Sequence, residues 1–218
     1  MYWCVASVVS VGAAVPRGPC RSRPWAIVTT ENGEHPDVVI LRRLRLRDKG
    51  GLDELARDHG SALVRAAYLF LGDAAAADDV AQDAMIAAWD AAPRAGPGTR
   101  LRPWLMGILF NRCRKWKRSL WRRFKRERAA AEVRREGEVA EGGEDEAERL
   151  EALRRSVRRL DESLREVLIL RYERRMSVEE CAAALGVPQG TVKSRVHKAV
   201  QLLRVYMGAA DERRSGRI

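Results

Sequence analysis

Apolar residues recur at steps of three and four along most of this chain, which is the period of an amphipathic α-helix. Three such stripes occupy Leu52–Phe70, Ala77–Trp89 and Trp104–Trp116, and the third follows Pro103, a residue that suits a first helical turn. No segment shows a convincing alternation of period two, as a half-buried strand would. The pattern therefore predicts an all-α N-terminal domain over residues 49–128.

Short polar signals mark where these helices end. Gly72 is placed to close the first helix, and Asp73 to cap the start of the second. The run Gly96–Gly98, with a proline at its centre, predicts a loop before the third helix.

Further helical stripes fill the C-terminal part of the chain and predict a second small all-α domain over residues 147–207, followed by a disordered tail over 208–218. Between the two domains the charge inverts within a few residues, from ten basic side chains and one acid over Arg112–Arg128 to eight acids over Glu132–Glu148. Glycines interrupt the acidic part. We therefore expect an acidic flexible linker over residues 129–146.

The most informative local pattern begins at the four residues Ser177–Glu180, which form a capping box and so fix a helix start. After a helix of about eight residues, Gly186 suits a left-handed turn, and Pro188 restarts a helix. A helix, a tight glycine turn and a second helix make a helix-turn-helix. In the second helix Val192, Val196 and Val200 face inward, which leaves a polar and cationic set outward: Gln189, Thr191, Lys193, Ser194, Arg195, His197 and Lys198. Such side chains contact phosphates and base edges in the major groove.

The first 48 residues show no obvious packed core. No acid precedes Glu31, and glycine and proline recur. Met1–Pro16 is apolar but lacks a preceding cation and is too short to cross a bilayer, so we predict neither a signal peptide nor membrane insertion. A disordered extension and a start codon assigned too far upstream explain residues 1–48 equally well.

Composition narrows the choice of partner. The chain has 41 Lys and Arg against 30 Asp and Glu, a net charge of +11 and a pI near 10.1, which favours nucleic acid. Its cysteines form no C-x-x-C pair and its three histidines lie far apart, so we expect reduced thiols in a cytoplasmic protein, no metal site and no cofactor. Phosphate loops and nucleophile motifs are missing from the sequence, so we expect no catalytic residue and no enzyme.

Two groups of motifs, in order along the chain, resemble a bacterial family. Leu160–Arg204 resembles sigma region four through Arg165–Leu168, Ser177–Glu180, Leu185–Pro188 and Gly190–Arg195. Gly72–Asp73, Ala77–Asp83, Ala88–Trp89, Arg102–Leu105 and Asn111 are similar to sigma region two of extracytoplasmic-function sigma factors. Asp161 stands where that family usually has proline, and Lys115 where an acid is common. The second departure bears on the detail of minus-ten recognition.

The resemblance implies a subunit that joins core RNA polymerase, directs it to two promoter elements and helps to melt the DNA. It implies docking on polymerase through one face of the second helix, namely Asp79, Gln82, Asp83 and Ile86. It implies contacts with the melted minus-ten strand from Arg100, Arg102, Trp104, Asn111, Arg112, Arg114, Lys115 and Arg118, while the outward set of the helix-turn-helix reads the duplex minus-thirty-five element. The family often has an anti-sigma partner as well.

An ordinary helix-turn-helix regulator that is not a polymerase subunit is the alternative. Such a regulator would carry an α/β receiver or ligand-binding domain, whereas Leu52–Phe124 reads as helices with an acidic face and a basic aromatic end. The family resemblance is therefore the better interpretation.

Overall fold

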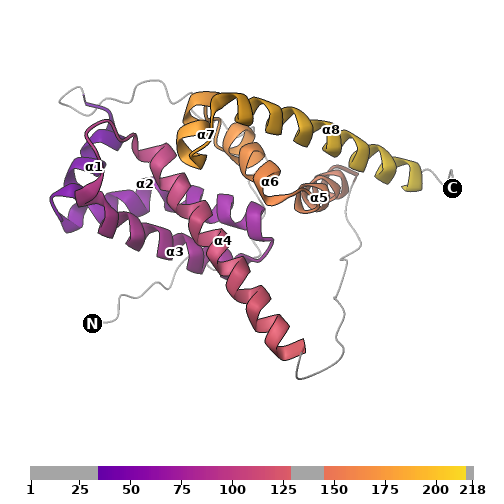
Figure 1. Cartoon of the computed structure of the whole chain (residues 1–218), viewed down its shortest axis with the longest axis horizontal. Coiled ribbons are helices and arrows are strands. Elements are labelled where there is room, and N and C mark those ends of the chain that lie inside the picture. Colours follow the sequence, from indigo (N-terminus) through magenta and orange to yellow (C-terminus); the bar gives the residue numbers. More distant parts are fainter. Residues whose placement is uncertain (1–33, 129–144, 215–218) are drawn as a thin grey trace. The chain divides into compact units, whose positions relative to one another are not determined.

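The computed structural model describes residues 34–128 and 145–214. Contacts divide the chain into two compact units, Met1–Pro36 and Asp37–Ile218, and the arrangement below is that of the second unit. Its described residues form helices and connecting turns without a strand (Figure 1). The prediction of an all-α fold is confirmed.

The first helix, α1 (Pro36–Arg45), differs from the expectation for residues 1–48. It buries Ile40, Leu41 and Leu44, so the stretch predicted to lack a core contributes to it. Its apolar period is only about three turns long and is interrupted by arginines, which hides it in the sequence. Asp37 contacts the buried His59 of α2 (Lys49–Leu71) through a 3.1 Å pair between Oδ1 and Nε2.

The ends of the next helices follow the predicted signals. The backbone of Gly72 adopts the left-handed conformation with φ of 81° and ends α2, and the Asp73 carboxylate accepts from the Ala76 amide at 3.0 Å to cap α3 (Ala74–Ala91). After the short 3-10 turn η1 (Ala92–Arg94) the chain enters α4 (Leu101–Arg128). Both caps are confirmed.

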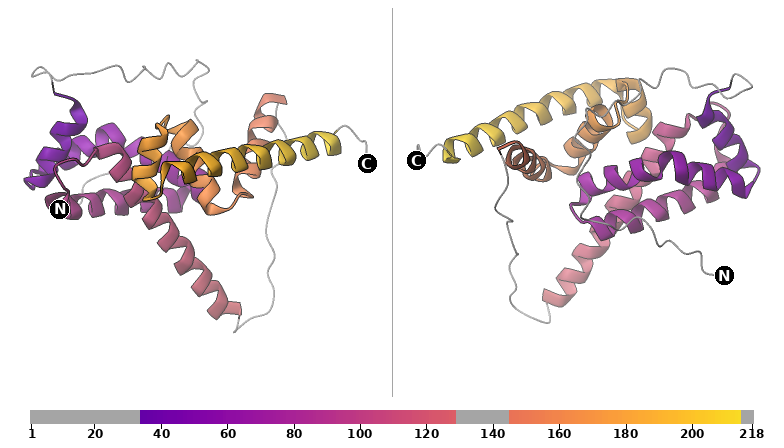
Figure 2. Two further views of the ribbon diagram at one scale, coloured as in Figure 1. Left: turned by 45° about the horizontal axis from the view of Figure 1, so that its top comes forward. Right: turned by 180° about the vertical axis from the view of Figure 1, so that it is seen from behind.

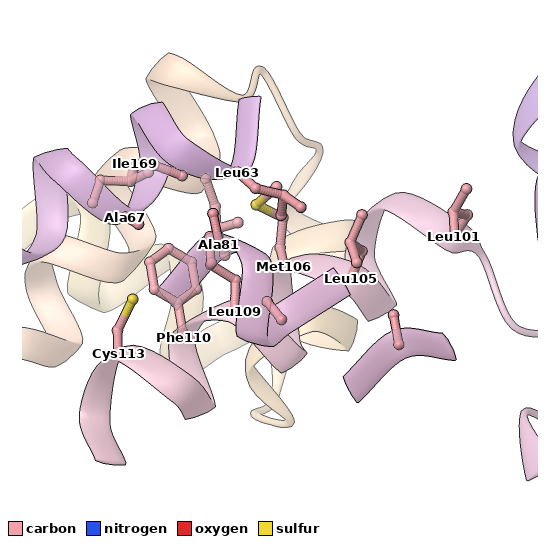
Figure 3. Close-up of a cluster of buried hydrophobic side chains, with 14 of the residues drawn as sticks. Leu63, Ala67, Ala81, Leu101, Leu105, Met106, Leu109, Phe110, Cys113 and Ile169 are labelled. Atoms are coloured by element: carbon pink, nitrogen blue, oxygen red, sulfur yellow. The ribbon is translucent and has the colours of Figure 1, made fainter. Parts of the chain in front are cut away.

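Helices α2 and α3 pack against each other, and α4 packs on both (Figures 1 and 2). Their apolar stripes meet in one core in which the Phe70 and Phe110 ring centroids lie 5.5 Å apart. Figure 3 shows Ile169, from the C-terminal half of the chain, beside Leu63 and Ala67 in this core. The principal core thus includes residues from both halves.

The C-terminal elements are α5 (Asp145–Arg158), α6 (Glu162–Leu168), the π-helical turn η2 (Ile169–Glu173), α7 (Val178–Leu185) and α8 (Gln189–Arg214). A second apolar cluster joins Leu160, Leu164 and Leu168 to Ala199 of α8. Helix α5 begins at Asp145, so residues 129–144 of the predicted linker lie outside the described residues. Helix α8 continues to Arg214, beyond the predicted start of a tail at residue 208.

Candidate DNA and polymerase interfaces

Helices α7 and α8 form the predicted helix-turn-helix. The Ser177 hydroxyl accepts from the Glu180 amide at 3.1 Å, and the Glu180 carboxylate accepts from the Ser177 amide at 2.8 Å. Gly186 then turns the chain with φ of 65°, a conformation that glycine adopts without steric cost. Pro188 precedes the first residue of α8, and its carbonyl accepts from the Val192 amide. The local signals read from the sequence are therefore present.

The outward set of α8 is mostly exposed. Gln189, Lys193, Ser194, His197 and Lys198 face solvent, whereas Thr191 is half-buried. The Ser194 hydroxyl donates to the Thr191 carbonyl at 3.0 Å, and the His197 and Gln201 side chains pair at 2.8 Å.

Arg195 differs from the other predicted members of that set because it is half-buried. Its positive charge contributes to lowering the pKa of Glu166 on α6, against a larger opposite effect of burial. Arg195 therefore lies near enough to α6 to act electrostatically on Glu166.

A second exposed surface lies on α3. Asp79, Gln82, Asp83 and Ile86 are all exposed, and the Ile86 side chain has 57% of its surface in contact with solvent. An acidic face that includes an exposed apolar side chain stands out on a cationic protein, and exposed apolar groups of this kind suit a protein partner. The four residues predicted for polymerase docking thus share one accessible helix face.

The residues predicted for the minus-ten strand divide into two groups. Arg112, Lys115 and Arg118 lie on one side of α4, where they line a groove with Trp116 and with Asp83 of α3. Cations interleaved with an aromatic ring suit a single-stranded nucleic acid, through backbone neutralisation and base stacking.

The second group contacts the C-terminal helices instead of solvent alone. Arg100 forms a 2.9 Å ion pair with Glu179 of α7, and Arg102 donates to the Arg174 carbonyl at 3.0 Å. Arg114 pairs with Glu166 of α6, and also donates to the Asn111 carboxamide at 2.6 Å. All three arginines thus bind partners in the C-terminal elements.

Trp104 is half-buried and packs against the principal core, which favours a structural part for this side chain. Trp121, farther along α4, is 66% exposed and lines a groove with Trp116, Leu71 and Glu162.

Glu166 and Arg165 were not singled out as functional residues, although both lie in the motif that resembles region four. Burial raises the pKa of Glu166, and Arg114 opposes that shift. The Arg165 guanidinium donates to the carbonyls of Phe70 at 2.5 Å and of Leu160 at 3.0 Å, and so joins the end of α2 to the start of α6. The sequence signal was a charged pair placed directly between the apolar residues Leu164 and Val167.

The cysteines and possible metal ligands of the described residues were predicted to have no chemical role. No group of three or more His, Cys, Asp or Glu side chains is arranged there to hold a metal ion. Burial raises the pKa of the Cys113 thiol to about 12 and that of Cys181 to about 11, so both remain protonated at neutral pH. None of the helices in these residues is long and apolar enough to span a membrane.

Comparison with known proteins assigns each of the two groups of motifs to a protein family. Residues 55–123 match the family Sigma-70 region 2, and residues 150–203 match the family Sigma-70, region 4. The chain is similar to the RNA polymerase sigma factor NccH of Alcaligenes xylosoxydans xylosoxydans, with 35% identity over 75% of this chain and 90% of the relative. It is 32% identical to CnrH of Cupriavidus metallidurans, over 84% of this chain and the full length of CnrH.

Solved structures that are similar to this chain are also sigma factors. CnrH in complex with the cytosolic domain of CnrY matches with a TM-score of 0.62 and 28% identity, over 80% of this chain and 99% of CnrH. RpoE of Bartonella quintana, in complex with the anti-sigma factor NepR, matches with a TM-score of 0.58 and 25% identity over 72% of this chain and 96% of RpoE. The chain therefore belongs to the extracytoplasmic-function (ECF) sigma factors of the sigma-70 family, which are DNA-binding proteins that act in transcription initiation.

Proposed function

We propose that this sigma factor joins core RNA polymerase in the cytoplasm and positions it at promoters that have two separated elements. In this proposal the exposed face of α8 reads the duplex minus-thirty-five element. The cationic side of α4 and the loop before it hold the melted minus-ten strand. The α3 face of Asp79, Gln82, Asp83 and Ile86 docks on polymerase.

The observation that carries the proposal is the presence of two different accessible surfaces on one chain. The α8 set is polar and cationic, and the α3 set is acidic and includes an exposed isoleucine. A protein that only binds DNA has no need of the second surface, because an acidic face repels phosphates. A polymerase subunit needs both.

The length of chain between the two regions supports recognition of separated elements. Between Arg128 and Asp145 the chain can extend to at most ~55 Å at ~3.3 Å per residue, which exceeds one duplex turn of ~34 Å. Both regions can therefore engage one promoter at once.

An anti-sigma factor is a further proposed partner. CnrH and RpoE of Bartonella quintana were each solved in complex with another protein, the cytosolic domain of CnrY and the anti-sigma factor NepR respectively. We propose that an inhibitor of this kind holds the present chain away from polymerase until a signal releases it.

Transcription in vitro with sigma-free core polymerase tests the proposal directly. We expect run-off transcripts from a promoter of the cognate regulon only when this chain is added, and a footprint that covers two separated elements. Binding to the same DNA without any dependence of transcription on the chain would instead identify a helix-turn-helix regulator.

A further inference from the structure

Helix α4 approaches the backbone of α7 at a position that only glycine allows. A Cβ atom added to Gly107 would lie 2.6 Å from the carbonyl oxygen of Ala184. That oxygen belongs to the main chain, so it cannot move away as the end of a long side chain would. Gly107, in the middle of a helix where glycine is a poor helix former, thus permits close contact between region two and region four.

Among the residues whose side chains the structure describes, several ion pairs cross between the same two regions, and the pairs given below share one polarity. The cation comes from region two, on α2, α4 or the loop before α4, and the carboxylate comes from region four, on α6, η2 or α7. The pairs are Arg65–Glu173 at 3.1 Å, Arg100–Glu179 at 2.9 Å, Lys117–Glu162 at 2.7 Å and Arg114–Glu166. Carboxylates of region four thus occupy positions that DNA phosphates could take beside the same cations.

The contact between region two and region four covers only one of the surfaces named in the proposed function. It engages Arg100, Arg102 and Arg114, which belong to the proposed minus-ten surface. The α3 face remains exposed, as do Lys193, Lys198 and most of the outward set of α8. The arrangement therefore covers part of the single-strand surface but leaves the proposed polymerase and duplex surfaces accessible.

Part of the contact between region two and region four is energetically unfavourable. Arg102 lies close enough to Arg174 to lower the pKa of that guanidinium, although burial is the larger cause of the shift. The Arg174 Nε atom is buried and has no hydrogen-bond partner. Two neighbouring cations and an unsatisfied donor weaken a contact, so a competing polyanion has less to overcome.

We propose that region four acts as a built-in inhibitor of region two, in which its acidic residues compete with single-stranded DNA for Arg100, Arg102 and Arg114. Opening exchanges arginine–carboxylate pairs for arginine–phosphate pairs, so single-stranded DNA and the closed contact exclude each other. This inference rests on the proposed function for the identity of the single-strand surface. The contact between Gly107 and Ala184 does not depend on it.

Gly107→Ala tests the inference, because the added methyl group is incompatible with the closed contact while alanine is the better helix former within α4. Gly60→Ala is the matched control, since Gly60 also lies within a helix and a Cβ there meets nothing within 4 Å. The full-length proteins are compared by the radius of gyration from solution scattering. Affinity is measured with a fluorescein-labelled single strand of mixed sequence and about 20 nucleotides, longer than the ~4–16 that one small domain covers.

We expect Gly107→Ala to increase the radius of gyration. If about one molecule in ten is open in the wild type, the affinity for the single strand should rise about tenfold. Gly60→Ala should match the wild type in both measurements. Glu179→Arg, which places a second cation beside Arg100 at an exposed position, should shift both quantities in the same direction by a smaller amount. It replaces Gly107→Ala as the deciding variant if circular dichroism shows that Gly107→Ala has lost helix.

Unchanged radius, or unchanged affinity, in a folded Gly107→Ala protein would overturn the inference, and so would tighter binding without expansion. The proposed function is judged separately by transcription with core polymerase. A wild-type chain that directs no transcription would refute that function, while the radius and affinity would still decide whether region four covers the strand-binding arginines.

Discussion

At the scale of single residues, Glu166 is the most deeply buried charged residue that the structure describes. Its side chain is 4% exposed and pairs with Arg114, and Arg195 adds a second favourable charge. Burial nevertheless outweighs both cations, because a carboxylate removed from water loses hydration that two partly solvated cations do not fully replace. The net result is a pKa raised above the ordinary value for glutamate.

Glu166→Gln should therefore change how stability depends on pH. Since the folded protein holds the proton of Glu166 more tightly than the unfolded chain does, this residue stabilises the fold most below the unfolded pKa. That contribution is lost as the pH rises through the raised folded pKa. Because glutamine does not titrate, the variant should not lose stability in this way as the pH rises. Urea unfolding free energies measured from about pH 4 to pH 8 should fall less steeply for Glu166→Gln than for the wild type.

Glu179→Gln is a suitable control for this experiment, because it removes a carboxylate that also pairs with an arginine but is 66% exposed. Its stability should follow the wild-type pH dependence closely, since an exposed ion pair contributes little. Parallel pH profiles for Glu166→Gln and the wild type would contradict the assignment of a raised pKa to Glu166.

At the scale of elements, the short helix α7 depends on its ends. It has eight residues, too few for a helix to be stable by propensity alone, and it begins with a complete capping box and ends at a left-handed glycine. Its packing places Cys181 in the same apolar core as Val192 of α8. The caps thus fix the angle at which α8 presents its outward side chains.

Ser177→Ala should lower the free energy of unfolding by about 1 kcal/mol, the usual cost of losing an N-cap hydroxyl. Ser61→Ala, at an exposed position within α2, should change it by less than about 0.5 kcal/mol. Chemical denaturation of the two variants and the wild type provides the comparison. Equal midpoints for Ser177→Ala and Ser61→Ala would show that the capping box does not stabilise α7.

The exposed face of α3 gives a second prediction at this scale. Reversing both charges, Asp79→Lys with Asp83→Lys, should weaken binding to core polymerase at least tenfold, about 1.4 kcal/mol, without loss of helix, because both side chains are exposed. Asp53→Lys with Asp58→Lys makes the same change of charge on exposed positions of α2 and serves as the control. A titration of fluorescent core polymerase that gives equal affinities for both doubles would remove α3 from the interface.

The elements that the sequence predicts well are those defined by neighbouring residues. The caps at Asp73 and Ser177, the turns at Gly72 and Gly186, and the buried stripe of α3 all follow from local chemistry. The π-helical turn at Ile169–Glu173 has no local signal, because the residues around it follow an ordinary apolar pattern. Helix α1 was missed for a similar reason: its stability comes from docking on α2, which a local pattern does not report.

At the scale of the whole molecule, the sequence indicated candidate surfaces but not the contacts between region two and region four. The arginines predicted for the minus-ten strand lie on α4 and the loop before it, and three of them bind partners in region four. Such pairing joins residues 52 to 79 positions apart, so no periodicity or motif contains it. Gly107 likewise looks like an ordinary weak point of a helix until the neighbouring carbonyl is known.

The chain between Arg128 and Asp145 gives the prediction that belongs to this scale. If both regions engage one promoter, this segment must reach from one element to the other. Deleting residues 132–141 would leave a span of at most ~25 Å, less than the ~34 Å of one duplex turn, so transcription from a two-element promoter should be lost. Doubling the segment should cost only ~0.6 kcal/mol, about a threefold loss, because closure entropy grows slowly with length.

Run-off transcription with saturating core polymerase measures both effects, and a variant with residues 129–144 in scrambled order controls for composition at constant length. Binding of the shortened protein to a duplex that carries the minus-thirty-five element alone should match the wild type, because α8 is unchanged. If the deletion variant initiated as well as the scrambled one, region two and region four would not need to reach separate elements. The bipartite reading of the promoter would then have to be abandoned even if the chain still activated polymerase.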